Sequence, residues 1–108
     1  HMCGGSDCPV EPFDVLPNLY YAVSRRDGRN GPQWYPENGV TLEEAVEMFT
    51  SEAAYASYDE DRYGTLTVGK YADLVVLDRN IFERPLEELF DTQVMLTMVE
   101  GEIVYQRG

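Results

Sequence analysis

The spacing of hydrophobic residues predicts two helices in the first half of the chain. Over residues 16–25 the apolar side chains recur at helical intervals, which predicts a short helix. Asp14 can cap its first turn, and Pro17 fits that turn because a missing N–H does no harm there. A longer apolar stripe predicts a second helix over residues 42–57. The stripe consists of Leu42, Ala45, Val46, Phe49, Ala53 and Ala56.

Local signals mark the start of the second helix and the loop before it. Thr41 and Glu44 form a capping box, in which the threonine hydroxyl bonds the Glu44 N–H and the glutamate side chain reaches back. Residues 27–40 are rich in glycine, asparagine and proline, and they include Trp34 and Tyr35. A long loop that carries aromatic residues often has a function or covers another part of the molecule.

The spacing in the last part of the chain is that of strands. Residues 64–68 form a short strand-like piece between glycines, and the apolar run 74–77 predicts a strand buried on both faces. An acidic helical turn is expected at 86–89. Segments 94–99 and 102–105 flank a Glu-Gly pair and predict a β-hairpin.

Helices followed by strands define an α+β arrangement, because alternating βαβ units are absent from the pattern. Two helices and three or four strands are few for an independent unit. We therefore expect an incomplete sheet with exposed edges.

Composition narrows the possible partners. The chain has 108 residues, which is one small domain at most, and a net charge of −12. That charge argues against binding to nucleic acid or to an anionic membrane surface. No apolar run approaches the roughly 20 residues of a membrane span, and no secretory signal is visible. A cytoplasmic protein is the expectation.

Potential metal ligands are scarce. His1-Met2 is interpreted as the remnant of a tag, which leaves no histidine in the rest of the sequence. Cys3 and Cys8 are expected to be free thiols, although a disulfide is possible. Their spacing is not that of a common zinc site, and a zinc-binding module that uses both thiols is a less favoured interpretation.

Two segments occur together in a recognisable order. The first is Gly5-Ser6-Asp7-Cys8-Pro9-Val10, and the second is Gly64-Thr65-Leu66 with Gly69-Lys70, Ala72-Asp73-Leu74-Val75-Val76-Leu77-Asp78, Gly101 and Val104-Tyr105. Together they resemble the C-terminal end of the metal-dependent amidohydrolase superfamily, in the branch that includes N-substituted formamide deformylases. The resemblance covers nearly all of residues 4–106.

The resemblance implies an enzyme of two parts. A TIM barrel would hold one or two divalent metal ions, with zinc expected, and a small composite β-sandwich would be built from the two chain ends. Residues 3–63 would be the last barrel loop and the closing helices, and residues 64–108 would be sandwich strands, with the barrel itself absent here. The whole enzyme would hydrolyse non-peptide carbon–nitrogen bonds in small amide-type substrates.

Asp7 matches the family aspartate that binds metal and accepts a proton from the attacking water. A carboxylate beside a metal-bound water can serve both purposes. The alternative is a turn residue whose side chain makes an Asx-type bond in the Gly-Ser-Asp-Cys-Pro bend. We expect the catalytic role in the whole enzyme and the turn role in this chain alone.

The chain also departs from the family pattern. The His-x-His pair, the bridging lysine or carboxylate and the later histidines are missing, so no metal and no activity are expected in this chain alone. Lys70 falls in a turn and is expected to be solvated. Arg25-Arg26 and Trp34-Tyr35 could line a substrate entrance, but a helix-end charge pair and a packed aromatic patch are favoured.

A second hypothesis is a free-standing, acidic, non-catalytic domain. Such a domain would bind a protein partner or itself through its open sheet edge. Strand 74–77 or hairpin 94–105 would then pair with another copy of the chain and give a homodimer.

Overall fold

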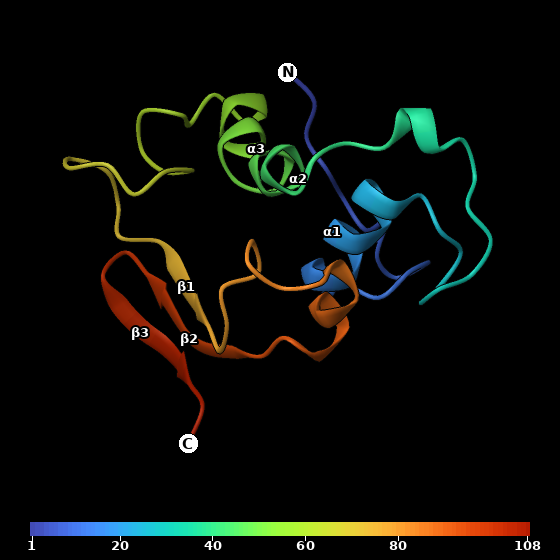
Figure 1. Cartoon of the computed structure of the whole chain (residues 1–108). Coiled ribbons are helices and arrows are strands. Elements are labelled where there is room, and N and C mark those ends of the chain that lie inside the picture. Colours follow the sequence, from blue (N-terminus) through green and yellow to red (C-terminus); the bar gives the residue numbers. More distant parts are fainter.

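The computed structural model describes residues 1–108 and has an α+β fold, which confirms the expected class (Figure 1). A three-stranded sheet lies on one side of the molecule and the α-helices on the other. None of the helices has the length and apolar character needed to cross a membrane. The elements in chain order are α1 (Val15–Ser24), η1 (Pro36–Asn38), α2 (Leu42–Met48), α3 (Ser51–Ala56), β1 (Leu74–Leu77), η2 (Leu86–Asp91), β2 (Val94–Val99) and β3 (Glu102–Gln106).

Helix α1 begins and ends within one residue of its predicted bounds. The Leu16 N–H donates to Asp14 Oδ1 over 3.2 Å, which is the expected cap. The helix ends at Arg25, which has a left-handed φ of 55° and whose N–H donates to the Tyr21 carbonyl oxygen. The left-handed conformation of Arg25 changes the direction of the chain at the start of the following loop.

The prediction of one continuous helix over residues 42–57 is wrong, because the chain leaves helical geometry between α2 and α3. Thr50 has φ −130° and ψ −93°. Its hydroxyl donates to the Val46 carbonyl oxygen over 2.7 Å, a contact that competes with the helical ladder. The Phe49 and Thr50 N–H groups bond three residues back, which tightens the last turn of α2. The apolar stripe continues across the break, so spacing alone did not reveal it.

The predicted capping box is present at the start of α2. The Glu44 N–H donates to Thr41 Oγ1 over 3.1 Å, and the Thr41 N–H donates to Glu44 Oε2 over 2.8 Å. Two of the N–H groups at the entrance to the helix are thereby bonded. The helix can then place Ala45, which is fully buried, against the core.

The sheet is antiparallel in the order β1-β2-β3, and the predicted hairpin is its β2–β3 half. Glu100 and Gly101 have φ of 51° and 83°. Positive φ at both central residues is the geometry of a type I′ turn, which matches the twist of paired strands. The Glu100 N–H donates to Asp73 Oδ1 over 2.7 Å, so the hairpin turn is tied to the start of β1.

Two expectations for the strands are wrong. Residues 64–68 form turn and coil instead of a strand, so the sheet has three strands. Strand β1 is not buried on both faces, since Val75 is 56% and Val76 46% exposed. Strand β1 lies at an edge of the sheet, and this chain supplies no layer that covers both of its faces.

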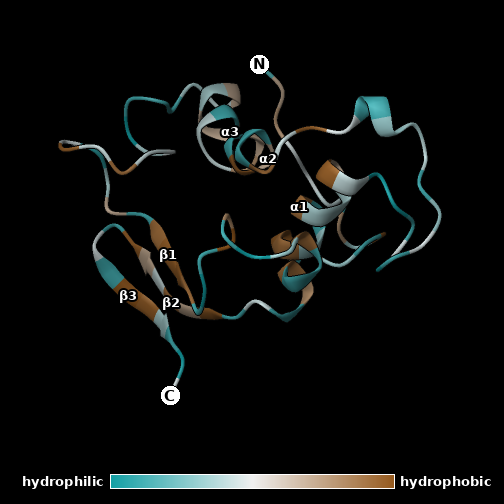
Figure 2. Cartoon of the chain, in the orientation of Figure 1, coloured by the Kyte–Doolittle hydropathy of each residue, from teal (hydrophilic) through white to brown (hydrophobic).

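Apolar residues occur along all three strands of the sheet (Figure 2), and several of their side chains are exposed. Because opposite residues on neighbouring strands share a face, Leu74, Met98 and Ile103 lie on one face and Val75, Thr97 and Tyr105 on the other. Ile103 is 54% and Tyr105 47% exposed. Neither face is therefore covered completely within this chain.

The buried core lies away from the sheet. Tyr20 on α1 is 1% exposed, and its ring centroid lies 4.7 Å from that of Phe90 on η2. The Tyr20 hydroxyl oxygen accepts a hydrogen bond from the Asn30 N–H over 3.2 Å. The core is thus formed by α1, α2, η2 and the loop between β1 and η2, and Leu77 at the end of β1 packs against it as a partly buried neighbour. Its buried members are Leu19, Tyr20, Ala45, Ile81 and Leu89.

An ion-pair network links the end of β1 to η2 and to the start of β2. Arg79 donates to both Asp78 carboxylate oxygens, over 3.0 and 2.9 Å, and to Glu88 over 3.2 Å. The Gln93 N–H also donates to Asp78, over 3.0 Å. The Arg79 guanidinium, and then the Gln93 N–H, lower the pKa of Asp78 from 3.8 to about 2.

Thr41→Ala should destabilise the fold by about 1 kcal/mol, because the Glu44 N–H loses its capping partner. A thermal melt followed by circular dichroism should show a midpoint lower by about 4–8 °C. Thr41→Ser is the matched control, since it keeps the hydroxyl and should melt close to the parent. An unchanged melting point for Thr41→Ala would contradict a stabilising role for the capping box.

Asp78→Asn should destabilise the fold at neutral pH much more than at acid pH. The folded-state pKa of Asp78 lies below its unfolded value, so the carboxylate stabilises the fold above about pH 5 and loses that effect as the pH falls toward 2. Urea unfolding at about pH 6 and about pH 2.5 measures this difference. Asp61→Asn, which removes an exposed carboxylate without a hydrogen bond, is the control. A stability loss of equal size at both pH values would contradict the assignment.

Candidate functional site

The Asp7 carboxylate is exposed and makes no hydrogen bond. Asp7 has a left-handed φ of 58°, and its carbonyl oxygen accepts a hydrogen bond from the Val10 N–H over 2.9 Å. The bend is thus closed by backbone, and the Asx-type side-chain bond expected in this chain is not formed. Aspartate tolerates the left-handed region better than most residues, and such conformations cluster at functional sites.

The segment that leads to Asp7 is attached to α2 and α3. The Gly4 N–H donates to the Met48 carbonyl oxygen over 2.9 Å. His1 Nδ1 lies 2.7 Å from Glu52 Oε2, and the His1 ring stacks on Tyr55 at 4.0 Å between centroids. The chain therefore reaches the Asp7 bend along the α2–α3 pair.

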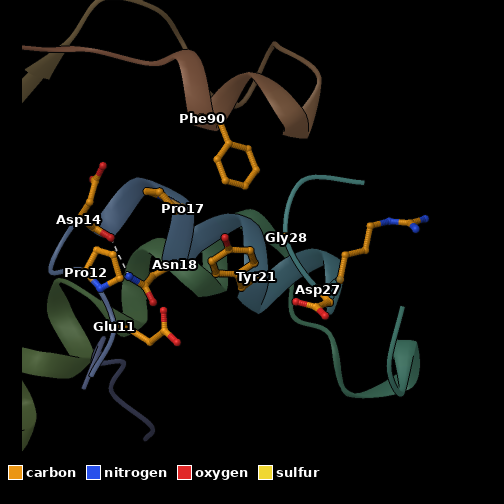
Figure 3. A pocket seen from close by; sticks show the side chains of 10 residues that line it. Glu11, Pro12, Asp14, Pro17, Asn18, Tyr21, Asp27, Gly28 and Phe90 are labelled. Carbon is orange, nitrogen blue, oxygen red and sulfur yellow. Dashed lines mark hydrogen bonds between the residues drawn. The ribbon is translucent and has the colours of Figure 1, made fainter. Parts of the chain in front are cut away.

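A cavity of about 570 Å³ is lined in part by Glu11 and Pro12, which follow the Asp7 bend in the sequence. Figure 3 shows its lining side chains. Glu11, Asp14 and Asp27 give it an acidic lining, while Tyr21 on α1 and Phe90 on η2 supply its aromatic part. The Asn18 amide nitrogen donates to the Asp14 carbonyl oxygen over 2.7 Å at its edge. The acidic lining is unfavourable for anionic molecules, and Asp7 is not among the lining residues.

The donor groups of this chain do not form a complete metal site. No three of its histidine, cysteine, aspartate and glutamate side chains come together in a group that could hold a metal ion. His1, the single histidine, is paired with Glu52. Cys3 and Cys8 are free and exposed. Asp7 can offer one carboxylate, whereas a catalytic zinc needs about three protein ligands.

The structure brings Arg25-Arg26 and Trp34-Tyr35 together. The Trp34 N–H donates to the Arg25 carbonyl oxygen over 2.8 Å, and Arg26 Nη1 donates to the Gly31 carbonyl oxygen over 3.1 Å. Trp34 is 59% and Tyr35 65% exposed, so the favoured interpretation of a packed aromatic patch is wrong for this chain. Arg26 also lines the acidic cavity.

Lys70 is bonded instead of simply solvated. Its ammonium group donates to the Glu60 carbonyl oxygen, and its backbone N–H donates to the Thr67 carbonyl oxygen over 3.1 Å. These contacts fold the turn between residues 60 and 71. Lys70 is therefore a structural residue in this chain.

Sequence reasoning missed the cavity and the contacts that shape it. Arg29 forms a bidentate ion pair with Asp91, and its guanidinium carbon lies 5.5 Å from the Phe90 ring centroid. The hydrogen bonds that the Arg29 guanidinium donates to the Asp91 carboxylate raise the pKa of Arg29 and lower the pKa of Asp91. These residues are about sixty positions apart, and no short motif links them. The one available signal was the acidic segment from Glu11 to Asp14 directly after the Asp7 motif.

Comparison with known proteins defines the family. The family model described as "Amidohydrolase family" matches residues 1–105. This chain is 32% identical to the protein named "Putative amidohydrolase YtcJ" of Bacillus subtilis strain 168 over 107 residues, which are 97% of this chain and 20% of that protein. The N-substituted formamide deformylase of Arthrobacter pascens is 34% identical over 102 residues, or 94% of this chain and 19% of that enzyme.

The chain belongs to the amidohydrolase family, as the resemblance of its motifs predicted. It spans about a fifth of the length of these two relatives. It is thus a fragment-sized member of a hydrolase family, and its own strands form an open three-stranded sheet and no barrel.

A solved structure supports the same fold. The crystal structure of an amidohydrolase from Thermotoga maritima MSB8 matches 94% of this chain and 22% of its own chain, with a TM-score of 0.68 and 24% identity. The helices and three-stranded sheet seen here therefore recur within a known amidohydrolase.

Proposed function

We propose that this chain is the C-terminal part of a metal-dependent hydrolase that cleaves non-peptide carbon–nitrogen bonds in small amide-type molecules. Family membership supports the hydrolase class, and the name of the Arthrobacter relative supports an N-substituted formamide as a first substrate to test. By itself this part is proposed to be inactive, because its potential ligands do not gather into the group of about three that a catalytic zinc needs. The whole protein is proposed to be cytoplasmic.

Asp7 is the proposed catalytic residue. The observation that carries this assignment is its exposed carboxylate, which makes no hydrogen bond inside the chain although its backbone is held in a left-handed bend. In the whole protein it would be one ligand to a divalent cation, with zinc expected, and would accept a proton from the water that attacks the substrate. The other ligands would come from residues outside this chain.

The two segments of the chain have different proposed roles. Residues 3–63 would form the last barrel loop and the helices that close the barrel, and residues 64–108 would supply sandwich strands. The apolar side chains exposed on both faces of the sheet support this division, because a covering layer from elsewhere in the protein would bury them.

Asp7→Asn in the whole protein should lower kcat/KM for an N-substituted formamide by about 10²- to 10⁴-fold, because the amide cannot accept the proton. Release of the amine product measures the rate. Asp61→Asn, a change of the same type at an exposed site, should leave the rate unchanged. Activity of Asp7→Asn close to the parent would contradict the assignment, and so would zinc-dependent turnover by residues 1–108 alone.

A second candidate is a free-standing domain that forms a homodimer through its open sheet edge. The exposure of all five residues of β3 favours it, because an edge strand with free backbone groups can pair with a second copy. Val104, 60% exposed on this strand, would lie in such an interface.

The homodimer hypothesis predicts that residues 1–108 dimerise at high concentration and that Val104→Lys abolishes the dimer. A lysine on an edge strand blocks edge-to-edge pairing. Val68→Lys makes the same substitution at a fully exposed site outside the sheet, and it should leave the dimer intact. Light scattering that finds a strict monomer would contradict this hypothesis.

A further inference from the structure

The break between α2 and α3 leaves a backbone acceptor beside the Asp7 bend. In a continuous helix the Met48 carbonyl oxygen would accept from the N–H of residue 52. Because the chain leaves helical geometry at Phe49 and Thr50, Met48 instead accepts the Gly4 N–H over 2.9 Å. Figure 1 shows the first residues of the chain, in dark blue, passing beside α2. The bond fixes a point three residues before Asp7.

The Phe49 ring also packs against Gly4. A Cβ added to Gly4 would lie 2.6 Å from Phe49 Cε2 and Cζ, which is far inside contact distance. Phe49 is half-buried, and it also packs against the core formed by α1, α2 and η2. One aromatic side chain therefore contacts both the core and the segment that leads to Asp7.

We propose that Gly4 and Phe49 are positioning residues for Asp7, acting through the Met48 carbonyl at the end of α2. This inference rests on the proposed catalytic role of Asp7. A half-buried ring and one backbone hydrogen bond fix the approach to the bend, while the Val10–Asp7 bond closes the bend itself. Such support matters because a displacement of about 1 Å at a reacting group can lower a rate by about 10²-fold.

The contact also gives a reason for glycine at position 4. A side chain larger than hydrogen at position 4 would require the Phe49 ring to shift. Gly5 is a useful contrast, because a Cβ there would meet nothing within 4 Å. Gly5→Ala is therefore a matched control for Gly4→Ala, one residue away in the same loop.

The test uses ¹H–¹⁵N spectra and amide hydrogen exchange of residues 1–108. Gly4→Ala should shift the resonances of residues 6–10 and speed exchange of the residue 4 amide by about tenfold or more, since its bond to Met48 is lost. Gly5→Ala should leave both unchanged. His1→Ala should also leave them unchanged, because the support is assigned to Gly4 and not to the contacts of His1.

Removing the ring tests the steric part of the inference. Phe49→Ala should speed hydrogen exchange of the residue 4 amide. Leu42→Ala, at the other end of α2 and also packed against the core, should not speed this exchange when the two variants are compared at conditions of equal unfolding free energy. The double variant Gly4→Ala/Phe49→Ala should exchange no faster at residue 4 than Phe49→Ala alone, because the added methyl group then has space. If Phe49→Ala does not fold, Phe49→Leu serves the same comparison. Effects of the two substitutions that add in the double variant, or loop shifts as large for Gly5→Ala as for Gly4→Ala, would overturn the proposal.

Kinetics of the whole protein separate this inference from the proposed function. Gly4→Ala should lower kcat about tenfold or more with KM nearly unchanged, because it moves the reacting carboxylate and not the binding surface. If Asp7→Asn is inactive while Gly4→Ala moves the loop without changing kcat, the positioning role is overturned. If the loop moves and neither variant changes kcat, the proposed role of Asp7 fails instead.

Discussion

The hydrogen bond from the Gly4 N–H to the Met48 carbonyl oxygen connects the candidate site to the rest of the fold. It exists because one potential long helix ends at Met48 and a second begins at Ser51. The capped start of α2 and the buried Ala45 set the position of this helix, and its C-terminal end then receives the segment before Asp7. The position of the Asp7 carboxylate thus depends on α2 ending at Met48.

The distribution of buried surface explains why the chain is better understood as part of a larger protein. Only eight of its 108 residues are buried, and the core cluster consists of residues of α1, α2 and η2 together with Ile81 in the loop between β1 and η2. The three strands pair with one another, yet the sheet exposes valine, isoleucine and tyrosine side chains on both faces. Apolar surface of this kind usually marks a contact with another chain segment or another protein.

Features with strictly local causes could be predicted from the sequence. The capping box at Thr41 and Glu44 and the hairpin turn at Glu100-Gly101 each depend on a few adjacent residues, and the structure contains both. The start of α1 could likewise be predicted, since Asp14 is a typical N-cap residue and its side chain caps the helix. The motif around Asp7 identified the family but not the geometry of the bend.

Features that depend on distant contacts or on competition between weak preferences could not be predicted. The break at Thr50 lies within an unbroken apolar stripe, where a hydroxyl-to-backbone bond disturbs the helical ladder. Segment 64–68 looked strand-like, yet no neighbouring strand is available to pair with it. The meeting of Tyr21 with Phe90 in the acidic cavity joins residues far apart in the chain, and no local pattern encodes it.

In its proposed role, Asp7 completes a cation site whose other ligands lie outside this chain. The most direct measurement is a crystal structure of the whole protein loaded with zinc, with the metal located by its anomalous scattering. The account predicts a carboxylate oxygen of Asp7 about 2.0–2.2 Å from a zinc ion, with every other protein ligand outside residues 1–108. A fully ligated zinc ion with Asp7 far from it would contradict the account.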